Sequence, residues 1–541
     1  MNKNRIVVVS ILLLGIILSM FVLYTPVPNT ELESEFNTKF AIEYIAEFAE
    51  KEHSVFDEEN HEEVRLYLKD KLEEFLGAEN VYEYDYDRSL FEDEIEYDIK
   101  NLLGVIPGES DTAIMIVAHY DSRGHIGRTG ELGNSFGAAD DGYGIATMLE
   151  IARIYGDKDL ENTIYILMTD GEETGLYGAA MAADEDFMDN VGFVINIEAR
   201  GVDGPAYMFE TSTDNAAVID FYKNAELPVS YSLATAVYTV MPNSTDFTEF
   251  LAVDKNGVNF AVLSGLYYYH TPHDNFTNVN PSSIEHYGRQ IIPMVDEFSM
   301  NEEYSDVDYF ESDSNQIFFT LFPNVFIAYG EGFGTILHTV LFVLSLGLLG
   351  LLFYKKQTDI KKLGVAFGIV IGSFVFTILL GYIISRVVAF ISKVPFNITY
   401  VRTTIGDIPT LITLGFITVL FGYLYYKKTT DEGIRDSIII IGAIINTFLA
   451  LITGIVLSGA SFLFLIPGLS AVLFLGMNQH MKGKLISKIL LGILMVLNIL
   501  VVIPILYSLY LALTVGGLLA LGLILVYYLL FLIPVFTTQF E

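Results

Sequence analysis

The distribution of hydrophobic residues divides the chain into three stretches with different periodicity. An uncharged apolar run extends from Ile6 to about Tyr24, and long apolar runs dominate again beyond residue 334. The residues in between alternate short apolar segments with amphipathic stretches. A run of roughly 19 apolar residues is long enough for one helix to cross a bilayer. The pattern therefore predicts a folded domain between a first membrane span and a group of later spans.

The apolar runs beyond residue 334 predict a helical membrane region. They lie near residues 335–354, 364–386, 409–426, 437–457, 459–477, 487–507 and 510–535. Each is about as long as a spanning helix requires. We therefore expect a retained signal anchor in residues 1–26, an outer domain in residues 27–330, and about seven transmembrane helices in residues 331–541.

The basic residues predict how these spans are oriented. Lys3 and Arg5 precede the first span, and further basic residues fall in alternate loops, at 355–362, 427–435 and 482–488. Positive charge concentrates on the cytoplasmic side of membrane proteins. Both termini are therefore expected in the cytoplasm and the domain of residues 27–330 outside it. In a prokaryote the membrane would be the plasma membrane.

Few ionisable residues lie within the spans, whereas a transport pathway usually contains buried charge. His338 and Arg386 are near span ends and are expected to reach the membrane interface. The sequence therefore gives a transporter no support.

The middle of the chain predicts an α/β fold. Residues 34–76 have helical spacing, and from residue 101 short apolar strands alternate with helices such as Ile145–Tyr155 and Gly175–Ala183. This alternation is typical of a mostly parallel mixed sheet flanked by helices. The expected strands are Leu102–Ile106, Ala113–Val117, Ile164–Met168, Phe193–Ile197, Tyr207–Phe209 and Phe260–Leu263.

Charge separates the two parts of the chain further. Residues 1–334 carry 61 acidic and 17 basic side chains, a net charge of −44, and residues 335–541 carry 6 and 13, a net charge of +7. An acidic domain repels phosphate, which argues against a nucleic-acid partner. The chain has no cysteine, so neither disulfides nor thiolate metal ligands are available.

Five clusters of histidine and acidic residues suggest chemistry. In chain order they are His119-x-Asp121, Asp140-Asp141, Glu172-Glu173, Glu198 and His270-x-x-x-Asp274. Several follow predicted strands, and ligands of such sheets bind beyond the carboxyl ends of the strands. Two imidazoles and several carboxylates suffice for a pair of divalent metals and a general base. The clusters therefore predict metal-assisted hydrolysis at one rim of the sheet.

The motifs around these clusters resemble the M28 family of co-catalytic zinc peptidases. The resemblance rests on Ala118-His-Tyr-Asp-Ser, Asp170-Gly-Glu-Glu-Thr-Gly and Tyr269-His-Thr-Pro-His-Asp, in that order. Asn196-Ile-Glu-Ala-Arg-Gly and Pro242-Asn-Ser-Thr-Asp-Phe are similar to its membrane-bound branch, which includes the endoplasmic-reticulum metallopeptidases and vacuolar membrane proteases. The likeness covers roughly residues 100–290 by motif, and the membrane half by architecture only.

The resemblance implies a set of metal ligands. Asp140 would be shared by two zinc ions, with Glu173 and His270 completing one site and His119 and Glu198 the other. Members of the family often have aspartate where this chain has Glu198. Imidazole and carboxylate ligands suit zinc, although manganese and cobalt also accept them.

Other residues receive roles around this centre. The resemblance implies that Glu172 is the general base, and Asp121 is expected to orient the His119 imidazole. Two roles are open for Tyr269, which either stabilises the oxyanion or packs as an aromatic side chain. Asp274 is a candidate to orient His270, and a position without that contact is the alternative. Asp141 is expected to cap a helix. His53 and His61 are expected to be exposed on a polar helical surface, and His125 and His273 to be loop residues or residues that support the metal ligands.

Three functions are compatible with these observations. The favoured one is a membrane-anchored zinc exopeptidase that acts on peptides, with an aminopeptidase preferred. A glutaminyl cyclase shares the fold, but such cyclases use tryptophan in the substrate pocket and this chain has none. An inactive receptor or scaffold would have lost ligands or the base, whereas all six candidate groups are present.

Overall fold

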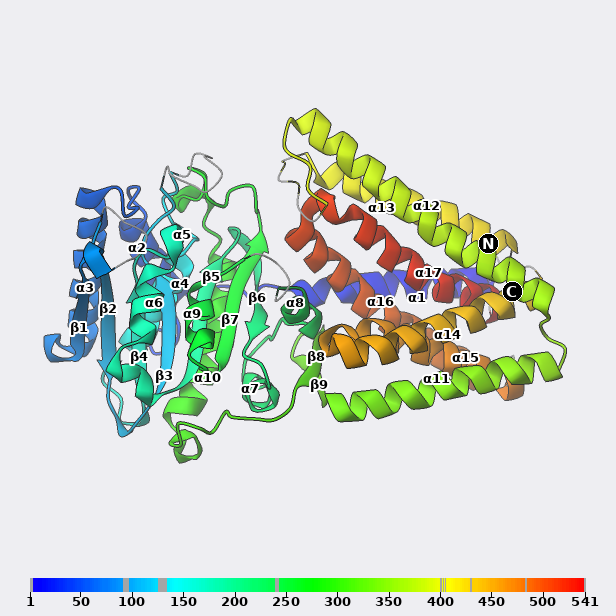
Figure 1. Ribbon diagram of the computed structural model, residues 1–541, viewed down its shortest axis with the longest axis horizontal. Helices are drawn as coiled ribbons and strands as arrows, with labels where there is room; N and C mark the ends of the chain where they lie inside the picture. Colours follow the sequence, from blue (N-terminus) through cyan, green and yellow to red (C-terminus); the bar gives the residue numbers. More distant parts are fainter. Residues whose placement is uncertain are drawn as a thin grey trace. The chain divides into compact units, whose positions relative to one another are not determined.

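The computed structural model describes residues 3–90, 97–124, 134–238, 243–398, 401, 403, 405–428, 431–481 and 484–539 (Figure 1). These residues form two compact units. One contains Tyr24–Thr320 and Asn324–Phe326, and the other contains Met1–Leu23, Leu321–Pro323 and Ile327–Glu541. We call them the sheet unit and the helical unit.

The sheet unit is built on seven strands in the order β1-β2-β4-β3-β5-β7-β6. The central pairs β3/β4, β3/β5 and β5/β7 are parallel, and β1/β2, β2/β4 and β6/β7 are antiparallel. The strands are β1 Val81–Tyr86, β2 Ile99–Ile106, β3 Gly108–His119, β4 Leu160–Thr169, β5 Val191–Ala199, β6 Asp203–Thr211 and β7 Gly257–Ser264. The mixed sheet with a parallel centre confirms the predicted fold class.

Helices cover both faces of this sheet (Figure 1). Met115 and Val117 of β3 pack against α6 and α9, while the buried alternate residues Ile114 and Ile116 face the opposite side. That side is covered by α4 and α10, with α2 and α3 packed on α4. Burial on both faces explains the uninterrupted apolar runs of the central strands. The helices are α2 Thr38–Phe48, α3 Glu58–Leu76, α4 Gly142–Tyr155, α5 Glu172–Gly175, α6 Tyr177–Ala183, α7 Ala216–Tyr222, α8 Ser232–Tyr238, α9 Asp246–Ala252 and α10 Pro281–Ser299.

The ends of the parallel strands carry the candidate residues. His119 is the last residue of β3, and the turn to Glu172 follows the last residue of β4. Glu198 lies inside β5 rather than after it, because that strand extends further than its apolar pattern suggests. Asp141 caps α4 by accepting a hydrogen bond from the Gly144 amide at 3.2 Å, which confirms its predicted role.

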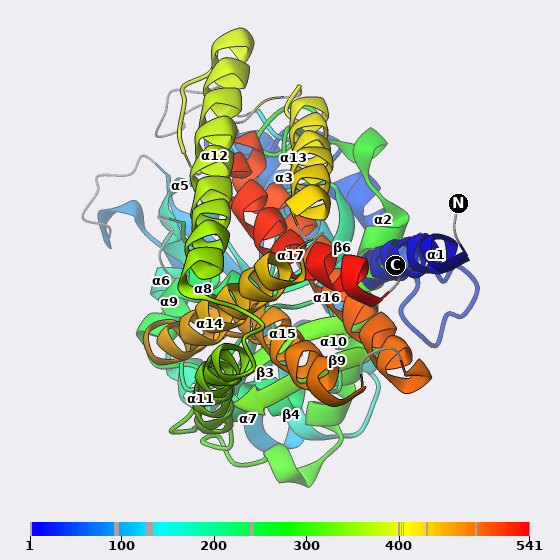
Figure 2. The ribbon, with the colours of Figure 1, turned by 90° about the vertical axis from the view of Figure 1, so that its right-hand side faces the viewer.

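The helical unit contains one helix for each predicted apolar run. The first, α1, spans Lys3–Met20 and continues as a 3-10 turn over Phe21–Leu23. A two-stranded ribbon, β8 Gln316–Phe322 and β9 Val325–Gly330, precedes the later helices. Helix α14 lies among α11, α12, α15 and α17 (Figure 2). These helices are α11 Glu331–Tyr354, α12 Ile360–Ser392, α13 Asp407–Lys428, α14 Glu432–Val456, α15 Phe462–Met481, α16 Leu485–Leu513 and α17 Leu518–Gln539.

By length and composition, 6 helical stretches within the described residues could cross a membrane. The last of them, Leu485–Leu530, is 46 residues long and contains α16, a 3-10 turn and most of α17. It therefore contains most of the apolar runs near residues 487–507 and 510–535, which predicted two separate helices. His338, which was expected at the interface, is fully buried in α11, with its ring beside Gly454 of α14.

Candidate metal centre

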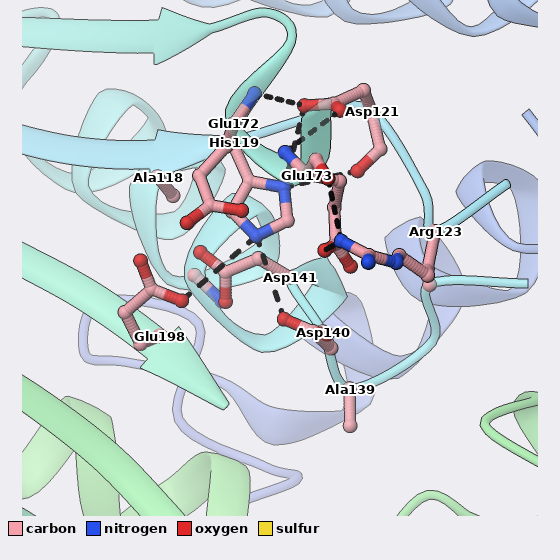
Figure 3. A network of polar contacts seen from close by, with 12 residues as sticks. Ala118, His119, Asp121, Arg123, Ala139, Asp140, Asp141, Glu172, Glu173 and Glu198 are labelled. Carbon is pink, nitrogen blue, oxygen red and sulfur yellow. Dashed lines mark hydrogen bonds and ion pairs between the residues drawn. The ribbon is translucent and has the colours of Figure 1, made fainter. Parts of the chain in front are cut away.

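Two groups of potential metal ligands lie in the sheet unit and share one residue. The first group is His119, Asp140 and Glu198, and the second is Asp140, Glu173 and His270, each with its ligand atoms within 4.8 Å of one another. Loops and strands that are far apart in sequence supply these side chains, which gather at the ends of β3, β4 and β5 (Figure 3).

Asp140 lies between two imidazoles and offers a different oxygen to each. Its Oδ1 is 3.4 Å from His119 Nε2, and its Oδ2 is 3.2 Å from His270 Nε2. Glu198 Oε2 is 3.9 Å from His119 Nε2, and Glu173 Oε1 is 3.0 Å from His270 Nε2. Ligand atoms bound to tetrahedral zinc at about 2.0–2.2 Å are separated by about 3.3–3.6 Å. The separations therefore approach those that two adjacent zinc sites require.

Several of the atoms that face this centre have no hydrogen-bond partner within the described part of the chain. They are His119 Nε2, His270 Nε2, Asp140 Oδ2 and Glu173 Oε1. Buried polar atoms are normally paired, and leaving one unpaired costs about 1–3 kcal/mol. Because the same atoms make up most of the two ligand groups, the residues fit metal cations well.

The Asp140 main chain is held by Asp274. The Asp274 carboxylate accepts hydrogen bonds from the Ala139 and Asp140 amides at 2.8 and 3.2 Å, and from Ser135 Oγ at 3.1 Å. The suggestion that Asp274 orients His270 is therefore wrong. Asp274 lies more than a hundred residues from Asp140 in the sequence, so no local sequence pattern indicates that the two are in contact. The peptide bond between Asp140 and Asp141 is cis.

Asp121 connects His119 to the turn that carries the two glutamates. The His119 Nδ1 atom is 2.9 Å from the Asp121 carbonyl oxygen and 3.5 Å from its carboxylate. The carboxylate itself accepts hydrogen bonds from the amides of Glu172 and Glu173 at 3.0 and 3.2 Å. Asp121 therefore orients the imidazole mainly through its backbone, while its side chain holds the first turn of α5.

Arg123 fixes the orientation of Glu173. One guanidinium nitrogen, Nη1, donates to the Glu173 carbonyl and is 3.0 Å from Oε2 of the same residue (Figure 3). The other oxygen, Oε1, is left facing His270. Arg123 thus determines which carboxylate oxygen of Glu173 is available to a cation.

Because carboxylates outnumber cationic groups at the centre, its electrostatic field favours the binding of positive charge. Burial lowers the pKa of His119, but contacts with Asp121 and Asp140 outweigh it and raise that pKa well above its usual range. Burial raises the pKa of Asp140, yet the two imidazoles outweigh it and hold that pKa below its usual range. Protons or metal cations can supply this charge.

Glu172 and Glu198 lie on the same side of the His119 imidazole (Figure 3). Burial raises the pKa of Glu172 well above its usual range, and the Glu198 carboxylate raises it further. The pKa of Glu198 is raised in the same way by burial and by Asp141 and Asp140. A glutamate with a raised pKa can take and return a proton near neutral pH.

Tyr269 stacks on His270 with ring centroids 3.6 Å apart. Burial raises the pKa of Tyr269 well above its usual range, and the negative charges of Asp140 and Glu173 raise it further. The neutral phenol is therefore beside the second ligand group. His270 itself has a φ of 54°, in the left-handed region, at the turn that brings its ring to Asp140.

Other histidines were assigned to the surface or to loops. His53 is fully buried, and the His61 side chain is only 12% exposed and pairs with Asp170, so the surface assignment of these two is wrong. His53 lies in the loop between α2 and α3, and His61 lies near the start of α3. Both are in polar sequence, so periodicity gave no sign of burial. His125 lies outside the described residues, as does Pro242.

A group of buried polar residues, not indicated by the sequence patterns, is connected to Glu198 through Asn196. The Asn196 amide nitrogen is 3.4 Å from Glu198 Oε1 and 3.0 Å from Asn259 Oδ1. Asn259 in turn donates to Glu210 Oε2 at 3.0 Å and to Thr245 Oγ1 at 2.8 Å. The missed acid Asp246 accepts a hydrogen bond from Thr169 in the same region. Thr245 and Asp246 belong to the stretch Pro242-Asn-Ser-Thr-Asp-Phe, which resembles the membrane-bound branch. That resemblance was the sequence signal for these two residues, although it assigned no function to them.

Comparisons with known proteins identify similar sequences over the sheet unit. Residues 101–295 match Peptidase family M28. A vacuolar membrane protease of Candida albicans (strain WO-1) is 30% identical over 240 residues, which cover 42% of this chain and 27% of that protein. The chain therefore matches only about a quarter of that relative's length.

Two solved structures are similar to about half of this chain. A leucine aminopeptidase precursor from Bacteroides thetaiotaomicron VPI-5482 has 19% identity and a TM-score of 0.41, and covers 51% of this chain and 99% of its own. A glutaminyl cyclase from Bacteroides thetaiotaomicron has 18% identity and a TM-score of 0.40, with the same coverage.

Glu210 is expected to make the stability of the sheet unit depend on pH. Burial raises the pKa of Glu210 to about 7, and the hydrogen bond from Asn259 offsets only part of this. The folded state then binds the proton more tightly than the unfolded state, so stability falls as pH rises from about 4.5 to about 7. Glu210→Gln imitates the protonated form. It should raise the free energy of unfolding above pH 7 by on the order of 2–3 kcal/mol and have little effect near pH 4.5.

The measurement is the midpoint of thermal unfolding of both proteins between pH 4.5 and 8. Parallel curves for the variant and the natural protein would show that folding does not shift the pKa of Glu210 and that the expectation is wrong.

Proposed function

Because residues 101–295 form a domain of peptidase family M28, we propose that this membrane protein is a di-zinc metallopeptidase that acts outside the cytoplasm as an aminopeptidase. The observation that carries the proposal is the position of Asp140 between His119 and His270, each of which has a second carboxylate beside it. This arrangement suits two cations that share one ligand.

The zinc ions would be held by the residues whose atoms lack partners in the protein. His119, Asp140 and Glu198 would hold one ion, and Asp140, Glu173 and His270 the other. When bound, such a pair polarises the substrate carbonyl and makes the attacking water more acidic. The imidazole and carboxylate ligands favour zinc over calcium or magnesium.

The residues of the chain would carry the protons. Glu172, which belongs to neither ligand group, accepts a proton from the water that attacks the peptide carbonyl carbon, and later gives it to the amine nitrogen as the C–N bond breaks. Asp121 accepts a hydrogen bond from the Glu172 amide and also contacts His119 through its carbonyl oxygen. It therefore holds the base close to the His119 imidazole. The Tyr269 phenol, neutral and beside His270, is a candidate donor to the oxygen that gains negative charge.

Contacts within the helical unit support the proposed orientation. Lys362 is 3.5 Å from Asp431, and Lys355 donates to Gln479 at 2.9 Å, so three basic loops lie at the same end of the unit. Thr514, which follows α16, bonds to Val401 in the loop between α12 and α13, at the other end of these helices. Alternating loops thus share a side, as expected when every apolar helix crosses the bilayer. The positive-inside rule then assigns the basic side, and with it both termini, to the cytoplasm.

The alternatives have less support. An inactive scaffold does not explain why the ligand atoms and Glu172 are brought together. A glutaminyl cyclase is disfavoured because the chain has no tryptophan for its substrate pocket.

Glu172→Gln is expected to lower kcat for peptide hydrolysis by at least about 100-fold, because the amide cannot accept a proton. Zinc content should stay unchanged, since Glu172 belongs to neither ligand group. The measurement is steady-state kinetics of the purified full chain, together with elemental analysis. Glu59→Gln, an exposed change on α3, serves as the control and should keep full activity. Normal turnover in Glu172→Gln would remove it from the role of base.

Peptides blocked at either end test the proposed specificity. An aminopeptidase requires the free ammonium group of its substrate, so N-terminal acetylation should abolish cleavage by the full chain with zinc. Amidation of the C-terminus should leave the rate within about 3-fold, because the distant carboxylate makes no required contact. Mass spectrometry of the products identifies the bond that is cut. Cleavage of acetylated peptides, with loss of activity on amidated ones, would indicate a carboxypeptidase instead.

A further inference from the structure

His61 contacts two catalytic segments from a helix that lies outside the matched family region. It belongs to α3, Glu58–Leu76, whereas the M28 match begins at residue 101. Its Nε2 atom is 2.8 Å from Asp170 Oδ1, and the two side chains are 12% and 0% exposed. The proposed chemistry at the metal centre uses neither residue.

Asp170 is the residue that starts the turn carrying Glu172 and Glu173. Its second carboxylate oxygen accepts a hydrogen bond from the Lys100 amide at 2.9 Å. Its own amide donates to Asn101 Oδ1 at 3.1 Å, and its carbonyl accepts from the Gly178 amide at 2.8 Å. Gly171, with φ 71°, then reverses the chain into α5. Asp170 therefore ties the turn to β2, to α6 and, through His61, to α3.

The same imidazole packs on the segment that carries His119. The ring of His61 stacks on Tyr120 with centroids 5.1 Å apart and an angle of 25° between the planes. Tyr120 directly follows His119, donates from its hydroxyl to the Lys100 carbonyl at 2.7 Å, and bonds through its amide to Thr169 at 2.9 Å. His61 thus contacts the ends of both β3 and β4.

Asp170 favours the charged form of His61. Burial lowers the pKa of His61, but Asp170, together with Asp121 and Glu62, offsets this effect, so the pKa lies above its usual value. An imidazolium that neutralises a fully buried aspartate fixes both side chains more firmly than a contact between neutral groups. Loss of the imidazole would leave the Asp170 carboxylate without its cation.

We propose that His61 is a positioning residue for the peptidase reaction, holding Asp170 and Tyr120 so that Glu172 and Glu173 face His119 and His270 correctly. The inference rests on the proposed function. It assigns part of the catalytic apparatus to the N-terminal helices, which the family match does not include.

Five variants of the full chain, purified in detergent with excess zinc, test this role, and one of them is the double variant His61→Ala/Asp170→Asn. His61→Ala removes both contacts, and His61→Gln keeps a donor for Asp170. Asp170→Asn removes the charge from the other side of the pair. Leu68→Ala is the matched control, because it truncates a fully buried side chain two turns further along α3. The measurements are kcat, KM, the unfolding midpoint, and the rate at which a chelator removes zinc.

We expect His61→Ala to lower kcat by about 10–100-fold with KM changed less than about 3-fold, and to lose zinc to the chelator about 10-fold faster, as Glu173 becomes less well held. Asp170→Asn should have a similar effect, and the double variant should be no worse than either single one. His61→Gln should recover most of the activity. Leu68→Ala should lower the unfolding midpoint and leave kcat and zinc release unchanged.

Two results would overturn the inference. One is normal kcat and zinc release in His61→Ala. The other is a loss of activity in Leu68→Ala as large as in His61→Ala at equal stability, which would make the role of His61 purely structural. If the natural protein hydrolyses no peptide but His61→Ala still releases zinc faster, the proposed function fails while the positioning role stands.

Discussion

The site depends on the concentration of buried carboxylates around two imidazoles. Asp140, Glu173 and Glu198 converge with His119 and His270 within a few ångströms, and Glu172 and Asp141 are close by. Such a concentration of negative charge is unfavourable in a protein interior unless cations neutralise it. Arg123 pairs with one of these ligands, Glu173, and the remaining carboxylates favour binding of further positive charge. The shared ligand Asp140 is the point where two cations would meet.

The surrounding fold holds these side chains through hydrogen bonds from main-chain amides and from the Arg123 guanidinium. Asp274 fixes the loop of Asp140, Asp121 fixes the turn of Glu172 and Glu173, and Arg123 selects one oxygen of Glu173. Each of these contacts joins segments that are distant in sequence and meet at the carboxyl ends of the parallel strands. Preorganisation of this kind lowers the cost of arranging charged groups during a reaction. It explains why an α/β sheet can support a centre whose ligands span about 150 residues of chain.

The sequence predicted the fold class and the convergence of the acidic clusters, because both follow from periodicity and from motifs at strand ends. Contacts between distant loops could not be predicted in this way. Asp274 looked like a partner of its sequence neighbour His270, but it bonds to the loop of Asp140. His53, in the loop before α3, is buried and His61 of α3 is only 12% exposed, although both lie in polar sequence, since the pattern of one segment does not reveal what packs on it. Likewise, apolar runs located the helices of the membrane region but did not show that His338 is buried against Gly454.

X-ray absorption at the zinc edge tests the central claim most directly. Measured on the purified full chain loaded with zinc, it reports both the first-shell ligands and any neighbouring metal. The account predicts nitrogen and oxygen ligands at about 2.0–2.2 Å and a second zinc ion at about 3.5–4 Å. Isolated zinc with no metal neighbour, at full occupancy of the protein, would contradict a cation pair that shares Asp140.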